Sequence, residues 1–283
     1  MRLIVTSAED VASMNIRDKL LKLAEWEETG IFEGSPVLSR EDCDMVLIRD
    51  IHLHRELLDA DVEKALGKRY DTMIFASRHR SESGLRTLTV HALGNYGAAD
   101  FGGQPGKLVP TDPRLMTKAL LLLKKYGSGL GFGISFETTH HGPYLETPTF
   151  FIEVGSSPDA WPEPEPARAI ARVILDLGGG DITGSDAIGI GFGGGHYAPR
   201  HTDVVERVGI SMGHMVPDYA IARVDREMLA QMIERTPGAS VAYFHKKAVK
   251  NPRKKELAEM LSEFGVRVVR SADLEPRAGM QKL

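Results

Sequence analysis

The stretch D-A-I-G-I-G-F-G-G-G-H-Y-A-P-R-H-T, residues 186–202, combines an apolar run, a run of glycines and a histidine. Residues 186–191 are typical of a short buried strand. Glycine has no Cβ, so the glycine run can take a positive φ and let another group approach the backbone. We therefore expect a strand that ends in a tight loop and presents His196. Because ligands bind outside the carboxyl ends of strands in open α/β sheets, this stretch is a candidate site.

Other histidines also stand directly after predicted strands, at the end of one, or inside an apolar segment. They are His79 after 72–77, His91 within 85–93, His140 and His141 after 130–136, His214 at the end of 210–213, and His245 after 240–244. If these strands share one sheet, several imidazoles converge at one edge. Imidazole is the commonest metal ligand and the usual general base near neutral pH. The alternative is that loops simply tolerate polar residues.

Strand and helix signals alternate along the chain. The expected helices cover 10–28, 54–66, 113–126, 167–177, 226–235 and 252–264, with a rigid proline connector at 161–166. This alternation predicts an α/β fold with three layers, α/β/α, around a mostly parallel or mixed sheet. We expect one catalytic domain over residues 1–283. The part from about residue 217 forms either a sub-lobe or the far edge of the sheet.

The composition is that of an ordinary globular protein of 283 residues with a net charge of −4. Such a charge does not suit a general polycation, so any nucleic-acid binding needs a local basic patch. Cys43 is the single cysteine, which excludes an internal disulfide and fits a reducing, cytoplasmic setting. No apolar run reaches membrane-spanning length, so we expect no membrane partner.

One strongly basic run, H-K-K-A-V-K-N-P-R-K-K at residues 245–255, contains no acidic residue. It resembles an electrostatic footprint for phosphates. The candidate phosphate-binding residues are Lys246, Lys247, Lys250, Arg253 and Lys254. The alternative is a solvated start of a helix, although positive charge there opposes the helix dipole.

Glu153 stands in the otherwise apolar strand F-F-I-E-V-G. A carboxylate there is costly to bury unless it is paired or bound to a metal, so Glu153 is either a zinc ligand or a general base. The alternative is a strand end that faces water. In the segment T-T-H-H-G-P, neighbouring residues of an extended chain point to opposite sides. We therefore expect at most one of His140 and His141 to bind a given ion.

The letters G-I-G-F-G-G from Gly189 match the dinucleotide fingerprint G-x-G-x-x-G. That fingerprint needs a helix that opens on its last glycine, and residues 195–199 are poor material for starting one. We therefore expect no nicotinamide cofactor.

Seven motifs together resemble the archaeal and plant type of D-aminoacyl-tRNA deacylase. They are S-M-N-I near the start, F-A-S-R-H at 75–79, T-x-H-x-x-G-N at 89–95, T-H-H-G-P at 139–143, F-F-I-E-V-G-S-S at 150–157, G-G-G-H-Y-A-P at 193–199 and G-H-M-V-P-D-Y-A at 213–220. The motifs run in order to about residue 220. Beyond it the likeness is only one of general pattern.

The resemblance implies a cytoplasmic, zinc-dependent hydrolase that frees tRNA from D-amino acids. It also implies a phosphorylase/hydrolase-like fold that resembles peptidyl-tRNA hydrolase. The alternatives are a zinc peptidase or phosphorylase-like enzyme acting on small substrates, and a tRNA-binding protein without catalysis. Zinc lowers the pKa of a bound water to about 7 and polarises a carbonyl, which suits ester hydrolysis.

With this resemblance we assign provisional roles to the candidate residues. His141 and Glu153 are the expected catalytic groups, and Gly193, Gly194 and Gly195 the expected oxyanion or phosphate binders. The expected zinc ligands are His79, His91, His140, His196 and His214. Because the resemblance implies a tRNA substrate, the phosphate-binding candidates of the basic run become the expected tRNA-binding residues, namely Lys246, Lys247, Lys250, Arg253 and Lys254. The family pattern does not separate ligands from catalytic histidines.

Overall fold

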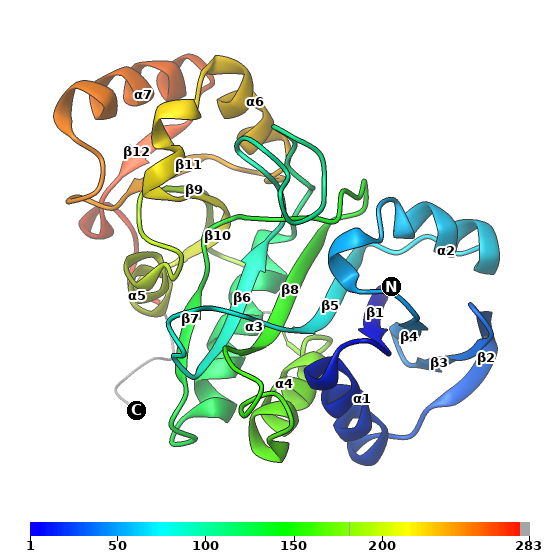
Figure 1. Cartoon of the computed structure of the whole chain (residues 1–283). Helices are drawn as coiled ribbons and strands as arrows, with labels where there is room; N and C mark the ends of the chain where they lie inside the picture. Colours follow the sequence, from blue (N-terminus) through cyan, green and yellow to red (C-terminus); the bar gives the residue numbers. More distant parts are fainter. Residues whose placement is uncertain (181, 278–283) are drawn as a thin grey trace.

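A computed structural model describes residues 1–180 and 182–277, and its strands form two sheets (Figure 1). Within these ranges the first sheet has eight strands in the order β2-β3-β4-β1-β5-β8-β6-β7. Their bounds are β1 Arg2–Ser7, β2 Glu27–Phe32, β3 Ser35–Arg40, β4 Cys43–Ile48, β5 Thr72–Arg78, β6 Thr87–Ala92, β7 Gly133–Phe136 and β8 Thr149–Gly155. The second sheet, in the order β10-β9-β11-β12, contains β9 Ala187–Phe192, β10 Ile210–Val216, β11 Val241–Phe244 and β12 Arg267–Val269.

Most neighbouring strands run parallel. Strands β4, β1, β5 and β8 are parallel, β6 is antiparallel to β8, and β7 is parallel to β6. An antiparallel hairpin, β2–β3, extends the opposite edge, and all pairs of the second sheet are parallel. The predicted α/β class with a mostly parallel, mixed sheet flanked by helices is confirmed.

Helices cover the faces of the sheets. They are α1 Val11–Leu23, α2 Leu58–Leu66, α3 Pro113–Gly127, α4 Pro164–Asp176, α5 Pro199–Arg207, α6 Arg226–Glu234 and α7 Asn251–Glu263, with short 3₁₀ turns η1 His52–His54, η2 Asp218–Arg223 and η3 Ser271–Asp273. Helices α1, α3 and α4 pack on one face of the first sheet. Within 1–180 and 182–277, none of the helices has the length and apolar character needed to cross a membrane.

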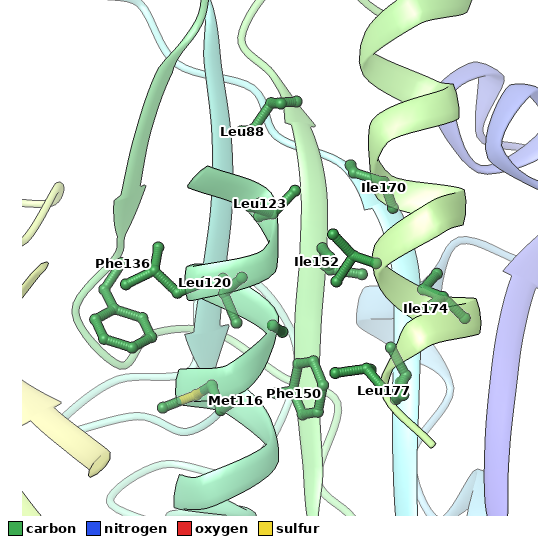
Figure 2. Close-up of a cluster of buried hydrophobic side chains, with 14 of the residues drawn as sticks. Leu88, Met116, Leu120, Leu123, Phe136, Phe150, Ile152, Ile170, Ile174 and Leu177 are labelled. Carbon is green, nitrogen blue, oxygen red and sulfur yellow. The ribbon is translucent and has the colours of Figure 1, made fainter. Parts of the chain in front are cut away.

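The main core lies between β8 and helices α3 and α4 (Figure 2). Leu120 and Leu123 of α3 and Ile174 of α4 meet Phe150 and Ile152 of β8, and all five are fully buried. Local sequence supports α3, because the Asp112 carboxylate accepts a hydrogen bond from Leu115 N and a proline occupies the first turn.

The second sheet begins at β9, upstream of residue 217. One of its faces packs against α6 and α7, where Phe192 and Phe244 stack with their ring centroids 4.6 Å apart. Residues of its other face, such as Met212 and Val241, join the main core beside α3 and α5. The division into one domain or a domain with a sub-lobe stays a prediction.

The predicted helix at 10–28 was too long. Helix α1 ends at Leu23, and the chain then enters the hairpin β2–β3, which the sequence reading missed. Strand β2 lies at the edge of the sheet, and only its last residue, Phe32, is buried. It therefore carries no alternation of apolar and polar residues that would reveal a strand.

Two proline-containing stretches also differ from expectation. The predicted connector at 161–166 contains the start of α4, and α5 begins at Pro199 where we expected no helix. Proline has no N–H and a fixed φ, so it fits the first turn of a helix, where the N–H groups have no intrahelical partner.

We predict that Leu120→Ala lowers the free energy of unfolding by about 2–5 kcal/mol, because it leaves a cavity in a fully buried part of the core. Leu85→Ala, at a side chain that is 57% exposed, should change it by less than about 0.5 kcal/mol. Denaturant titration of both variants gives the comparison. Equal losses would contradict this description of the core.

Candidate metal centre

Two candidate residues lie on the face of the first sheet that α3 and α4 leave uncovered. Glu153 of β8 pairs in register with Ser77 of β5 and Thr89 of β6, and His91 lies opposite Phe151. Because alternate residues of a strand share a face, His91 and Glu153 point to the same side. Their nearest atoms, Nε2 and Oε2, are 3.5 Å apart, and both side chains are buried.

The glycine stretch lies against the segment that follows β7. Thr138 N donates to His196 O at 3.0 Å, and Ala198 N donates to Phe136 O at 2.9 Å. Glu137 and Tyr197 form an isolated antiparallel bridge. These backbone contacts join the two sheets and place His196 beside Glu137.

Glu137 lies at the centre of the resulting cluster. Its Oε2 is 3.3 Å from His196 Nε2 and 3.5 Å from His140 Nε2, and its Oε1 is 3.5 Å from His79 Nδ1. His79 Nδ1 also lies 3.5 Å from Glu153 Oε2. Loop and strand residues from both sheets therefore converge on one carboxylate.

Both Glu137 oxygens lack a hydrogen bond although the side chain is 0% exposed. Burial raises the pKa of a carboxyl, but His196, followed by His79 and His91, holds the pKa of Glu137 below its ordinary value. Glu153 Oε2 and His91 Nε2 are likewise buried without a hydrogen bond. A buried carboxylate without donors is costly, and a bound cation is one way to offset that cost.

Three imidazoles are oriented by backbone carbonyls. Nδ1 of His91, His140 and His141 lies 3.1, 2.8 and 2.7 Å from the carbonyl oxygens of Ala92, Thr138 and Gly142. If each Nδ1–H donates to that oxygen, each Nε2 keeps a lone pair for another partner. Outer hydrogen bonds of this kind fix the tautomer of metal-binding histidines.

The donors fall into three overlapping groups whose ligand atoms lie within 4.8 Å of one another. They are His79, Glu137, His140 and His196; His91, His140 and His141; and His91, Glu137 and Glu153. Nitrogen and carboxylate oxygen donors of this number suit a zinc ion. The described residues therefore include a group that could hold a metal, with Glu137 buried and His196 exposed.

The pKa values of the cluster histidines are shifted in opposite directions. Burial would lower the pKa of His79, but the carboxylates of Glu153 and Glu137 raise it to about 8. Burial and the neighbouring His91 lower the pKa of His141 to about 4. Burial, with His91 next, also lowers the pKa of His140 well below its ordinary value. At neutral pH, His140 and His141 are therefore neutral, and each has a lone pair that can bind a metal.

The cluster adjoins an open cavity of about 640 Å³. His79, His140, His141, His196 and Glu153 line it on the cluster side. Its rim carries charged and aromatic residues, namely Arg78, Arg80, Asp100, Phe101, Tyr219 and Arg223. A ligand can therefore reach the cluster from solvent.

The glycine run does not offer the donors that we expected. Gly193 N donates to Val216 O at 2.9 Å, and Gly194 N donates to the Asp218 carboxylate. Both residues have positive φ. The expected oxyanion role of Gly193 and Gly194 is therefore wrong, because their N–H groups already hold β10 and η2. The expected oxyanion or phosphate role of Gly195 stays a prediction.

His214 lies outside the cluster, contrary to the expected ligand role. Its Nε2 lies 2.9 Å from Val109 O, and its Nδ1 lies 3.1 Å from Thr139 Oγ1. Thr139 Oγ1 in turn accepts a hydrogen bond from Met215 N. With both ring nitrogens in use, His214 holds the segment that presents His140 and binds no metal.

Only some residues of the basic run are exposed, and others make contacts within the fold. Lys246, Lys247 and Lys250 are exposed, and Lys250 is the N-cap of α7. Arg253 instead donates to the Ile221 and Val224 carbonyls, and Lys254 lies over the Phe244 ring. Arg253 therefore serves the fold, which removes it from the expected tRNA contacts.

Sequence reasoning missed Glu137 as a site residue. The signal was present in G-I-S-F-E, an apolar strand that ends in a carboxylate just before T-T-H-H. The argument applied to Glu153 applies here too, since an acid at the end of an apolar strand is costly to bury.

The fold and the cluster define an α/β protein with a partly buried set of donors able to hold a metal. A family model described as D-aminoacyl-tRNA deacylase matches residues 66–269, and the chain belongs to that family. It is 38% identical over 98% of its length to a D-aminoacyl-tRNA deacylase of Methanococcoides burtonii, of which it spans only 58%. The equivalent protein of Methanosarcina acetivorans is 35% identical, with 99% of this chain and 95% of that protein covered.

A solved crystal structure has the same fold. It is described as a conserved protein of unknown function, is 29% identical and superposes with a TM-score of 0.89 over 98% of both chains. Because 98% of both chains is covered, the likeness includes both sheets and the loops between them that carry the cluster.

We predict a pH-dependent loss of stability that involves His214. Burial lowers its pKa from 6.5 to about 4, so the unfolded chain binds the proton more readily. Its contribution is fully present above pH 6.5 and is lost as pH falls toward 4, by up to about 1.4 kcal/mol per pH unit. Denaturant titrations at several pH values across this range give the free energy of unfolding. Its slope against pH should be shallower for His214→Gln than for the wild type. Equal slopes would contradict the prediction.

Proposed function

We propose that this protein hydrolyses the ester between a D-amino acid and tRNA, with zinc held by the histidine–carboxylate cluster. The observation that carries the proposal is Glu137, a fully buried carboxylate with no hydrogen bond, surrounded by imidazoles beside an open cavity. Membership of the D-aminoacyl-tRNA deacylase family supplies the reaction and the substrate class.

The donor set fits the ion by number and by chemistry. Glu137, His140 and His196 would hold the ion with nitrogen and carboxylate oxygen donors of the kind zinc prefers, and three protein donors leave a position for water or the ester. When bound, zinc would supply a Lewis acid for the ester carbonyl and lower the pKa of water. The other four members of the cluster, His79, His91, His141 and Glu153, are then left for orientation and proton transfer.

The protein groups divide these tasks according to their contacts. His141 is neutral at neutral pH and anchored through Nδ1, so its Nε2 keeps a lone pair that can accept a hydrogen bond from the attacking water and orient it. Glu153 lies 3.5 Å from both His79 and His91 and is suited to orienting these rings. Chiral choice would then arise from the shape of the cavity wall.

The first test uses one tRNA charged with either enantiomer of one amino acid. The zinc-loaded protein should release the D-amino acid and spare the L form, chelation should abolish release, and added zinc should restore it. Glu137→Gln should lower turnover by at least about 10²-fold, because it removes a charged donor. A rigorously metal-free sample with full activity would reject the metal. Equal rates on both enantiomers would favour a general esterase, and RNA binding without release would favour a non-catalytic role.

The exposed lysines Lys246, Lys247 and Lys250 are the proposed contacts to the tRNA backbone. They lie in the loop whose Ala248 packs against Gly193, so the loop borders the glycine run that leads to His196. Phosphate contacts give affinity that falls with salt and carry no sequence information.

The second test replaces all three lysines with alanine. KM for charged tRNA should rise and its salt dependence should flatten by about 0.7–0.9 per lost contact on a log–log plot, with kcat nearly unchanged. The matched control, Lys22, Lys64 and Lys125 to alanine, removes the same charge from α1, α2 and α3. If both triple variants keep the wild-type salt slope, the tRNA surface lies elsewhere.

A further inference from the structure

Two exposed aromatic side chains line the cavity that leads to the cluster. Phe101, in the loop 98–106, is 68% exposed, and Tyr219 of η2 is 70% exposed. Single exposed apolar residues are common, but two from distant parts of the chain at one opening indicate a binding surface.

The backbone that carries Phe101 is firmly held. Phe101 O accepts from Gly142 N at 3.2 Å, and Asn95 Nδ2 donates to Gly102 O at 3.0 Å. Gly102 packs so closely that a Cβ there would lie 1.8 Å from Leu53 O. The ring is thus exposed on a fixed loop, next to the turn that carries His141.

The backbone of Tyr219 is held by two other parts of the chain. Asp218 N donates to Gly194 O at 2.9 Å, so the glycine run fixes the start of η2. Arg253 Nε donates to Ile221 O at 3.3 Å and fixes its middle from α7. Both rings are therefore carried by a held backbone, so a flat ligand would have to order only their side-chain rotamers.

Cationic side chains accompany the rings. Arg78, Arg80 and Arg223 line the same cavity, with the carboxylates of Asp10 and Asp100. Asp10 is already engaged, since it accepts hydrogen bonds from Ser13 N, Ser77 Oγ and Arg78 N. Flat rings beside guanidinium groups are the elements with which proteins bind unpaired nucleotides, by stacking on the base and pairing with phosphate.

We propose that Tyr219 and Phe101 form a stacking platform for the 3′-terminal adenine of the tRNA, with Arg80 and Arg223 facing the neighbouring phosphates. The inference rests on the proposed function, which places the ester of that nucleotide at the cluster. The platform holds the base at the rim while the aminoacyl group reaches toward His141. The loop lysines described above then contact more distant phosphates.

The test compares one D-amino acid esterified either to adenosine or to methanol. Tyr219→Ala should raise KM for the adenosine ester roughly 5- to 100-fold and leave the methyl ester unchanged. Tyr219→Phe should behave like the wild type, because stacking uses the ring and not the hydroxyl. Ile31→Ala, a matched truncation at a 70% exposed residue of β2, should change neither ester. An equal loss on both esters, or no loss on either, overturns the platform.

A binding measurement separates this inference from the proposed function. A short RNA that ends in an unpaired adenosine should bind the wild type and bind Tyr219→Ala or Phe101→Ala roughly 5- to 100-fold more weakly. Equal binding by wild type and both variants overturns the platform. If the wild type hydrolyses no D-amino acid ester, the proposed function fails. The stacking platform is then tested only by comparing the RNA affinity of the wild type with that of the two variants.

Discussion

The burial of Glu137 among imidazoles is the constraint on which the site depends. An ionised carboxylate that is fully buried without a hydrogen bond destabilises a fold unless positive charge compensates for it. Three histidines approach it to 3.3–3.5 Å, from loops that follow strands β5, β7 and β9. The loops after β7 and β9 are held by backbone contacts between the two sheets, and His79 N donates to Val154 O within the first sheet. The proposed metal would therefore stabilise the junction of the sheets as well as catalyse.

The glycine stretch has a different task from the one its composition suggested. The amides of Gly193 and Gly194 are not free to bind a ligand, because they donate to Val216 O and to the Asp218 carboxylate. The missing Cβ of Gly193 matters, since a Cβ there would lie 2.6 Å from the Cβ of Ala248. The glycines thus let β9, η2 and the lysine-containing loop pack together. The glycine run 193–195 therefore helps to position both His196 of the cluster and η2, which carries Tyr219 at the cavity.

Much of the fold could be predicted from the sequence, because strands buried on both faces read as apolar runs and α3 has clear caps. The hairpin β2–β3 could not, since its exposed edge carries no pattern. His91 and Glu153 were recognisable as polar residues inside apolar strands, and Glu137 obeys the same rule. The exclusion of His214 was out of reach, because its partners Val109 and Thr139 are distant in sequence. Hydrogen bonds of this kind depend on the assembled sheets.

The central claim is that Glu137, His140 and His196 hold a zinc ion. Anomalous diffraction at the zinc edge, from crystals of zinc-saturated protein, tests it most directly. The account predicts a strong peak among His140 Nε2, His196 Nε2 and the Glu137 carboxylate, and its loss in Glu137→Gln crystals. A map with no peak in the cluster, or with zinc only at surface histidines, would contradict it.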